Sequence, residues 1–366
     1  METTASQLDC RAHVLKLIEE TRAVSESELQ VNNITPYHVT KSHCEQIVKS
    51  GYYDQLKYIV EPSIREFDGP GTLHRSGEHD NTVVPGLQHK YAQNGILLVT
   101  ERCGSYCRYC LRKRIVGKVS DEIAPDFGRV AQYIARHPET TNVLLSGGDP
   151  FVLSTSNLNK TVDHLLPIEH LKSIRLGTKM LAYAPERFDE SALSALVQRI
   201  HRAGKSPIII AHFDHVGEIS SGAERKVRAL RLRNCTPCAR SSLKSTMIPE
   251  ILAATFAKCH EIGVRPYYLF QARPVKGGSH FQVALGRGLE MVACICGTTR
   301  IKFPRRWVRS FPDRTSRQPA GWMICPNNEI CRTPSSATNM ERLRYARRPT
   351  KDIQVEPPAA ALGRQR

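Results

Sequence analysis

The sequence predicts an α/β fold, a partial (β/α) barrel in which parallel strands alternate with helices. Short apolar runs recur between 95 and 271, and amphipathic stretches of helical period separate them. Alternation of this kind predicts a parallel sheet, either doubly wound or closed toward a barrel. Residues that could bind ligands or take part in catalysis follow nearly every run. They lie at the strand ends where barrel enzymes carry their active sites. This recurrence favours the barrel.

The expected strands are short apolar runs of five to seven residues. They lie at 95–100, 142–146, 174–178, 207–213 and 265–271. The expected helices have apolar residues spaced three and four apart, and they lie at 127–137, 158–166, 192–203, 224–232 and 251–262. Before them, 8–60 has the pattern of short helices, and 61–90 is rich in Gly, Pro, His and Asp and is expected to be a loop.

These patterns divide the chain into three parts. Residues 1–90 form a helical N-terminal extension and loop, 91–292 form the barrel domain, and 293–366 form an irregular basic tail without a period. The tail is expected to be either disordered or translated out of frame. The chain has a net charge of +17, and 294–366 hold 15 Lys/Arg against 5 Asp/Glu. A basic tail can bind phosphate backbones, but this one has few interleaved aromatic residues and no known motif, so we do not expect nucleic acid as a partner.

The expected location follows from apolar patterning. No stretch approaches 18 apolar residues, so no membrane span is expected. The sequence shows no apolar signal-peptide core near residue 1, which favours a cytoplasmic protein with reduced thiols.

Cys103, Cys107 and Cys110 form a C-x3-C-x2-C cluster directly after the first expected strand. Three thiolates at this spacing suit a soft metal centre, and a [4Fe–4S] cluster normally takes four Cys ligands. Only three ligands would leave one iron open to a small molecule. Zinc with a distant fourth ligand and free thiols are the alternatives.

Ser146-Gly147-Gly148-Asp149 follows the next strand. The two glycines lack a Cβ, so the backbone there can approach a ligand closely. Asp149 or the neighbouring carbonyls can hold an ammonium group. The alternative is an ordinary turn between a strand and a helix.

Four segments together resemble the lysine 2,3-aminomutase family of radical S-adenosylmethionine (SAM) enzymes. They are Thr-Glu-Arg-Cys-Gly-Ser-Tyr-Cys-Arg-Tyr-Cys-Leu-Arg-Lys-Arg (100–114), Leu-Leu-Ser-Gly-Gly-Asp (144–149), Ala-His-Phe-Asp-His (211–215) and Arg-Pro-Tyr-Tyr-Leu-Phe-Gln (265–271). The resemblance covers about 90–292. It implies a radical SAM barrel, a [4Fe–4S] cluster, SAM and, often, pyridoxal phosphate (PLP). It also implies a 5′-deoxyadenosyl radical that initiates a 2,3-amino migration on an amino acid or a protein-bound lysine.

The resemblance assigns roles by position. Cys103, Cys107 and Cys110 would hold the cluster, Tyr109 would lie near the adenine, and Ser146, Gly147, Gly148 and Asp149 would line SAM. Arg112 matches the arginine that pairs with the substrate carboxylate, a task that suits a planar guanidinium; its alternative is a surface charge. His212 and His215 are as consistent with a structural role as with a site. A reductant such as flavodoxin or ferredoxin is implied, and a homo-oligomer is left open.

Three departures from the family narrow the expectation. Arg273 stands where the lysine enzymes carry an Asp for the distal ammonium, and two cations would repel. We therefore expect a substrate other than free lysine. The tail is the second departure: Pro349-Thr350-Lys351 is its best match to the family's turn with the PLP lysine, so Lys351 is the candidate. A radical SAM enzyme without PLP, or an inactive family member, are the alternatives.

The third departure is the segment 235–248, which lacks a convincing strand where the family has one. A one-base shift over Ser245-Thr246-Met247-Ile248 would read Val-Asn-Asp-Asp, close to the family pattern. We therefore expect compensating frameshifts around 237–248, which would make Cys238 an accident rather than half of a metal site. The encoding DNA decides this.

Overall fold

The computed structural model describes the core of the chain and several shorter pieces. The described residues are 28–29, 34–67, 71–74, 77–188, 190–231, 238–242, 248–270, 272, 275–284, 287–288 and 291, with four strands between 307 and 343. Two of the predicted site residues, Arg273 and Lys351, lie outside them.

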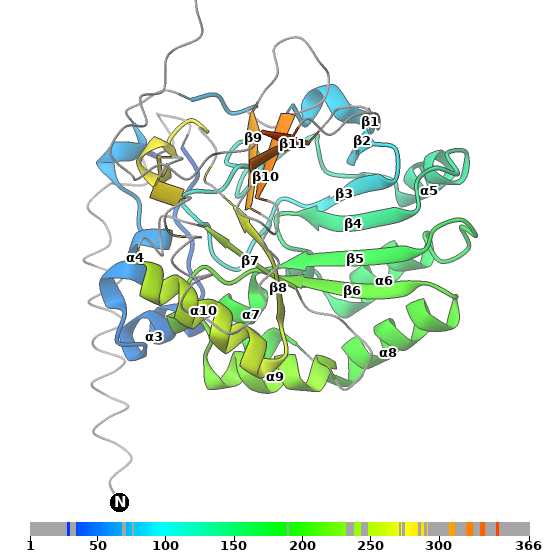
Figure 1. The fold of residues 1–366 in the computed structure, drawn as a ribbon. Helices are drawn as coiled ribbons and strands as arrows, with labels where there is room; N and C mark the ends of the chain where they lie inside the picture. Colours follow the sequence, from blue (N-terminus) through cyan, green and yellow to red (C-terminus); the bar gives the residue numbers. More distant parts are fainter. Residues whose placement is uncertain are drawn as a thin grey trace, which may run out of the picture.

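The first sheet has six strands in chain order, β1 to β6 (Figure 1). They are β1 (Thr82–Val84), β2 (Leu87–Tyr91), β3 (Asn94–Thr100), β4 (Asn142–Gly147), β5 (Ser173–Thr178) and β6 (Ser206–Ala211). β1, β2 and β3 pair antiparallel, whereas β3 to β6 pair parallel. Because these parallel strands share one direction, the loops that leave β3, β4, β5 and β6 meet at one edge of the sheet.

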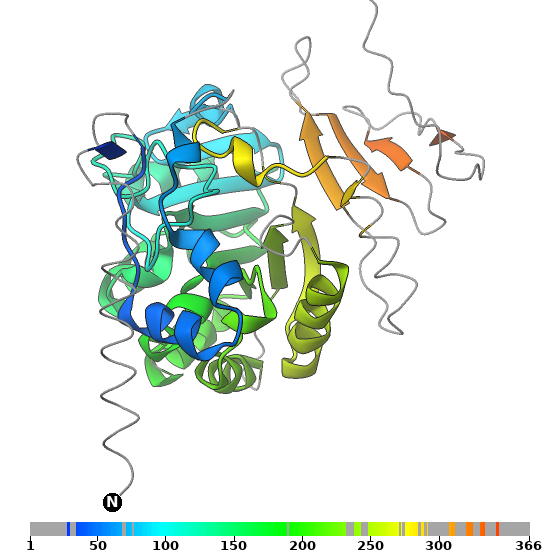
Figure 2. The ribbon, with the colours of Figure 1, turned by 90° about the vertical axis from the view of Figure 1, so that its left-hand side faces the viewer.

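Along the chain the helices alternate with the strands, as the periodicity predicts, and in space they pack against the strands (Figure 2). They are α5 (Phe127–Ala135), α6 (Thr155–Asp163), α8 (Glu190–Arg202), α9 (Ser221–Arg231) and α10 (Pro249–Ile262). Their apolar faces share one core with alternate strand residues, such as Val143 and Leu145 of β4, which are fully buried. A polar cap fixes the start of α5, where Asp126 accepts the backbone N–H of Gly128 at 2.8 Å.

A second sheet has the order β12-β11-β10-β9-β8-β7. Its strands are β7 (Cys238–Ser242), β8 (Arg265–Phe270), β9 (Trp307–Phe311), β10 (Ala320–Ile324), β11 (Ile330–Thr333) and β12 (Arg342–Leu343). β7 to β9 pair parallel and β9 to β12 antiparallel. β6 and β7 are neighbours, but no ladder joins them among the residues described here.

The second sheet corrects two expectations. The segment 235–248 was expected to lack a convincing strand, yet β7 lies within it and pairs with β8 along its length. The tail was expected to be irregular, yet it carries β9 to β12. Strands of two to five residues give no periodicity that a sequence reading can detect, and their ladders come from partners elsewhere in the chain. The frameshift hypothesis itself is not tested by these strands.

The N-terminal extension packs beside the loop that follows β3. Two helices, α3 (Lys41–Lys49) and α4 (Tyr53–Val60), bury a small apolar cluster against which Tyr109 packs. The stretch 61–90 is not all loop: besides short 3-10 turns it holds β1 and β2. Among the described helices, none is long and apolar enough to cross a membrane.

Candidate active site

The three cysteines lie on the loop that leaves β3. All three thiols are free and half-buried. Burial raises the pKa of each, to about 11 for Cys107, and for Cys103 the charges of Asp149, Cys110 and Cys107 add to the rise in pKa. The three thiols share one short loop. They would lose their protons on binding a metal.

The donor set fits an iron–sulfur cluster. Within the described part of the chain, no three His, Cys, Asp or Glu side chains converge closely enough to hold one metal ion. In a four-iron cube each cysteine would bind its own iron, so the three thiolates would not need to converge on one point. Cys103, Cys107 and Cys110 lie on one short loop and suit that arrangement.

The far side of the loop is anchored by a buried ion cluster that we call the Glu66 cluster: Glu66, Arg108 and Lys113. The Glu66 carboxylate accepts two hydrogen bonds from Arg108, at 2.7 and 2.9 Å, and one from Lys113 at 2.7 Å. The three side chains are 0 to 1% exposed. Burial alone would raise the pKa of Glu66, but the two cations hold it below its ordinary value. The carboxylate therefore stays ionised and ties the loop to the N-terminal extension.

The Gly-Gly turn at the end of β4 is locked to the start of the cysteine loop. A Cβ on Gly147 would lie 2.3 Å from Thr100 O, and one on Gly148 would lie 2.1 Å from Arg102 O. Gly147 also has φ +116°, which disfavours other residues. The backbone N–H of Asp149 donates to Arg102 O at 2.8 Å. Here the close approach that the glycines permit is to the backbone beside Cys103.

The Asp149 carboxylate is already hydrogen-bonded within the protein. Its Oδ2 accepts from Thr178 Oγ1 at 2.9 Å and from the Lys179 N–H at 2.6 Å, and its Oδ1 accepts from the Phe151 N–H at 3.0 Å. Burial raises the pKa of Asp149 to about 6, although these donors oppose the rise. Asp149 thus joins the ends of β4 and β5, and direct contact with SAM stays a prediction.

Arg112 joins the same two loops. Its Nη1 donates to Ser146 Oγ at 2.8 Å and to Gly147 O at 3.2 Å, while its Nε donates to Glu78 Oε1 at 3.0 Å. Glu78 also pairs with Arg114 at 2.7 Å. The alternative that Arg112 is only a charge on the surface is wrong, because its side chain is only 13% exposed.

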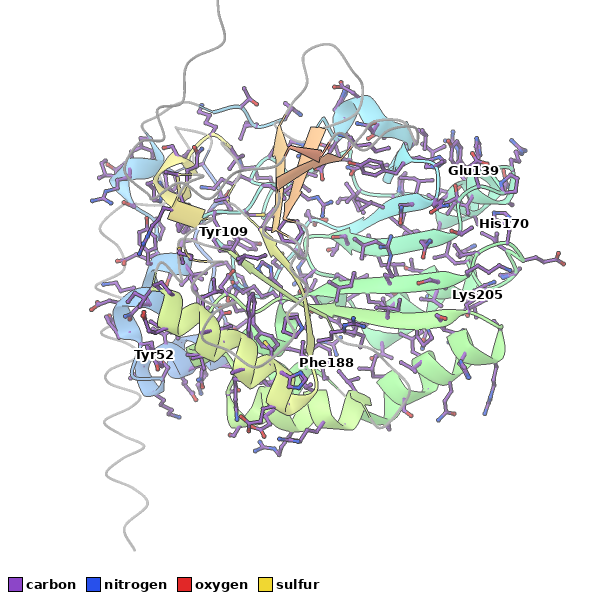
Figure 3. The ribbon with its side chains drawn as sticks, viewed as in Figure 1. Tyr52, Tyr109, Glu139, His170, Phe188 and Lys205 are labelled. Carbon is purple, nitrogen blue, oxygen red and sulfur yellow. The ribbon has the colours of Figure 1, made fainter. Side chains whose placement is uncertain are left out.

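Sequence reasoning missed the Glu66 cluster and also a second buried ion cluster, which we call the Lys179 cluster: Lys179, Asp214 and Glu218. The Lys179 ammonium pairs with the Asp214 carboxylate and lies 2.9 Å from Glu218 Oε1. It also donates to the Tyr109 hydroxyl at 3.1 Å, which itself donates to Asp214. Lys179 follows the end of β5, and Asp214 and Glu218 follow the end of β6. Figure 3 shows Tyr109 beyond these strand ends and Glu139, His170 and Lys205 at the opposite edge of the sheet. The signal that could have found Lys179 is its place directly after Thr178.

The charges of this cluster shift one another. Burial alone would lower the pKa of Lys179, but the two carboxylates raise it above its ordinary value. Burial alone would raise the pKa of Asp214, but Lys179 and His212 hold it well below its usual range. Burial raises the pKa of Glu218 to about 7, with Lys179 opposing and the Asp214 charge adding to the rise. One ammonium between two acids leaves one of them close to protonation at neutral pH.

Tyr183 connects this cluster to the cysteines. It ends the short helix α7 (Met180–Tyr183), and its hydroxyl lies 2.8 Å from Cys107 Sγ. Burial raises the pKa of the Tyr183 phenol well above its ordinary value, so the hydroxyl keeps its proton.

The two histidines of the 211–215 motif separate in role. His212 lies 3.0 Å from Asp214 Oδ1 and extends the Lys179 cluster toward solvent. His215 is fully buried, and its Nδ1 accepts the N–H of Gly217 at 2.9 Å. Burial lowers the pKa of His215 to about 4, so its imidazole is neutral at neutral pH.

A thiol loop and a Gly-Gly turn, locked together at the carboxyl ends of parallel strands, define an α/β enzyme with its site at that edge. A relative from Aquifex aeolicus, which carries the provisional name L-lysine 2,3-aminomutase, is 34% identical over 289 residues, 77% of this chain and 76% of its own. The L-lysine 2,3-aminomutase of Acetoanaerobium sticklandii is 28% identical over 271 residues, 73% of this chain and 63% of its own. The chain belongs to the lysine 2,3-aminomutase family.

Two further comparisons are weaker. No model of a protein family matches the chain. Among solved structures, the radical SAM methyltransferase TsrM of Kitasatospora setae is 14% identical with a TM-score of 0.35, over 63% of this chain and 43% of its own.

Proposed function

We propose that the protein is a radical SAM aminomutase that moves an amino group from C2 to C3 of an amino acid or a protein-bound lysine, on a partial barrel formed by the two sheets. The observation that carries the proposal is the locking of the thiol loop to the Gly-Gly turn, in a chain of this family. When bound, the cluster supplies the electron that cleaves SAM to methionine and a 5′-deoxyadenosyl radical. PLP, an electron donor of the flavodoxin or ferredoxin class, and a cytoplasmic location belong to the proposal.

The chain's own residues would orient the reactants. Cys103, Cys107 and Cys110 would hold the cluster. The backbone carbonyls of Ser146 and Gly147 would accept hydrogen bonds from the amino group of SAM. The Asp149 carboxylate would act by holding that turn against β5, since its oxygens are already bonded.

Arg112 would bind the substrate carboxylate. Its Nη1 already points at the turn through Ser146, so one edge of the guanidinium is fixed. Glu78 occupies the other edge, where a substrate carboxylate would form the same pairing. If a substrate carboxylate replaced Glu78 at Arg112, Glu78 would still be paired with the Arg114 guanidinium.

The substrate would carry an anionic or neutral distal group if Arg273 faces it, as the sequence predicts. A guanidinium repels an ammonium and pairs with a carboxylate or phosphate. Efficient turnover of free L-lysine would contradict this part of the proposal.

The test is anaerobic reconstitution of the full chain with iron and sulfide, then addition of SAM and dithionite. We expect about four irons and four sulfides per chain, with methionine and 5′-deoxyadenosine as products, and a matched Cys107→Ala protein that forms neither. Borohydride reduction in the presence of PLP, followed by peptide mass spectrometry, should place the adduct on Lys351. Zinc in place of iron, or no inorganic sulfide, would overturn the proposal; cleavage of SAM without any PLP adduct would replace the aminomutase by another radical reaction.

A further inference from the structure

Tyr183 presents its phenol to a predicted cluster ligand. It is 2% exposed, and its Oη lies 2.8 Å from Cys107 Sγ. A thiolate bound to iron has no proton to give, so the phenol has to be the donor in the loaded protein.

The Tyr183 ring is held on several sides. The His43 ring, from the N-terminal extension, lies 4.3 Å from it between centroids, and the Lys179 ammonium lies 5.0 Å from its centroid. The Thr40 hydroxyl donates to the Tyr183 carbonyl. Residues from two distant parts of the chain therefore fix the direction of the hydroxyl.

We propose that Tyr183 is a positioning residue that raises the reduction potential of the cluster by donating its O–H to the Cys107 thiolate. The inference rests on the proposed function, because it requires a cluster at these cysteines. Reduction takes one electron from an outside donor and places negative charge on the iron and its sulfur ligands. An O–H dipole aimed at one of those sulfurs stabilises the reduced form more than the oxidised form, and hydrogen bonds to sulfur are among the protein's means of setting cluster potentials.

The test is a potentiometric titration of the reconstituted full-length protein, followed by electron paramagnetic resonance in the absence of SAM. Tyr183→Phe removes only the hydroxyl, so we expect full iron loading and a midpoint potential shifted to more negative values. Replacement of Tyr183 by 3-fluorotyrosine keeps the ring and strengthens the donor, so the shift should be positive. The matched control is Tyr133→Phe on α5, which loses a 3.0 Å hydrogen bond to His89 and should leave the potential unchanged.

The outcomes are separable from those of the proposed function. A wild-type chain that takes up no iron and sulfide defeats the function before any variant is measured. A loaded wild type whose potential equals that of loaded Tyr183→Phe overturns only the role of Tyr183. If Tyr183→Phe does not load, the fluorotyrosine protein decides: a positive shift supports the inference, and no shift overturns it.

Discussion

The two buried ion clusters beside the cysteine loop have opposite balances of charge. The Glu66 cluster has one carboxylate for two cations, and its side chains are 0 to 1% exposed. The Lys179 cluster has two carboxylates for one ammonium, with side chains 0 to 8% exposed. The first lies where the loop meets the N-terminal extension, and the second lies at the ends of β5 and β6, in contact with Tyr109.

The difference shows how charge balance separates an anchor from a responsive element. In the Glu66 cluster the cations keep the pKa of Glu66 low, and burial with Arg108 lowers the pKa of Lys113 to about 8 against the pull of Glu66. At neutral pH the Glu66 carboxylate is therefore ionised and the Lys113 ammonium is protonated. In the Lys179 cluster burial raises the pKa of Glu218 to about 7, so this cluster changes protonation near neutral pH.

The largest expected effect is the removal of the single acid from the Glu66 cluster. Glu66→Gln leaves Arg108 buried without a counter-charge, and a guanidinium cannot lose its proton to relieve this. We expect the free energy of unfolding to fall by about 3–5 kcal/mol, and the purified protein to load less iron. Chemical denaturation and iron analysis measure both.

The control for this change is Glu45→Gln, which breaks an exposed pair with Lys49 and should cost less than about 1 kcal/mol. Equal losses in the two variants would show that the Glu66 cluster is no anchor.

A smaller effect is expected from removing the single cation of the Lys179 cluster. Lys179→Met leaves Asp214 and Glu218 buried together, but carboxylates, unlike Arg108, can take up protons and become neutral. We expect a loss of about 1–3 kcal/mol at pH 7 and a smaller loss at pH 5. Denaturation at both pH values tests this, and a loss that grows as the pH falls would contradict it.

The periodicity of apolar residues along the chain made the core strands and helices of this molecule predictable. The apolar runs and helical periods between 95 and 271 each have a counterpart in β3 to β6, β8 and the intervening helices. The cysteine spacing and the Gly-Gly turn stand out because their chemistry lies within a few consecutive residues. The structure brings both together at the expected edge.

The ionic partners were not predictable in the same way. Glu66 lies 42 residues before Arg108, and Glu78 lies 34 residues before Arg112, both in a stretch that suggested only a loop. The run Arg112-Lys113-Arg114 looked like one charged segment. The structure sends its first and third members to Glu78 and its second to Glu66, a division that only tertiary packing creates.

The sharpest contrast with the Glu66 cluster is the pH response of Glu218. Its pKa is about 7 in the folded protein against an ordinary value of 4.5, so between these values the folded state holds a proton that the unfolded state releases. Stability from this group is therefore complete below about pH 4.5 and falls as the pH rises toward 7. Glu218→Gln, which cannot titrate, should lack this fall.

His43 and His215 change stability in the opposite direction, because burial lowers the pKa of His43 to about 3 and that of His215 to about 4. The measurement is therefore the difference between Glu218→Gln and wild type in free energy of unfolding, taken from pH 5 to 8. It should rise up to about pH 7 and then level off. A flat difference would mean that both clusters are fixed in charge, and the contrast between them would be lost.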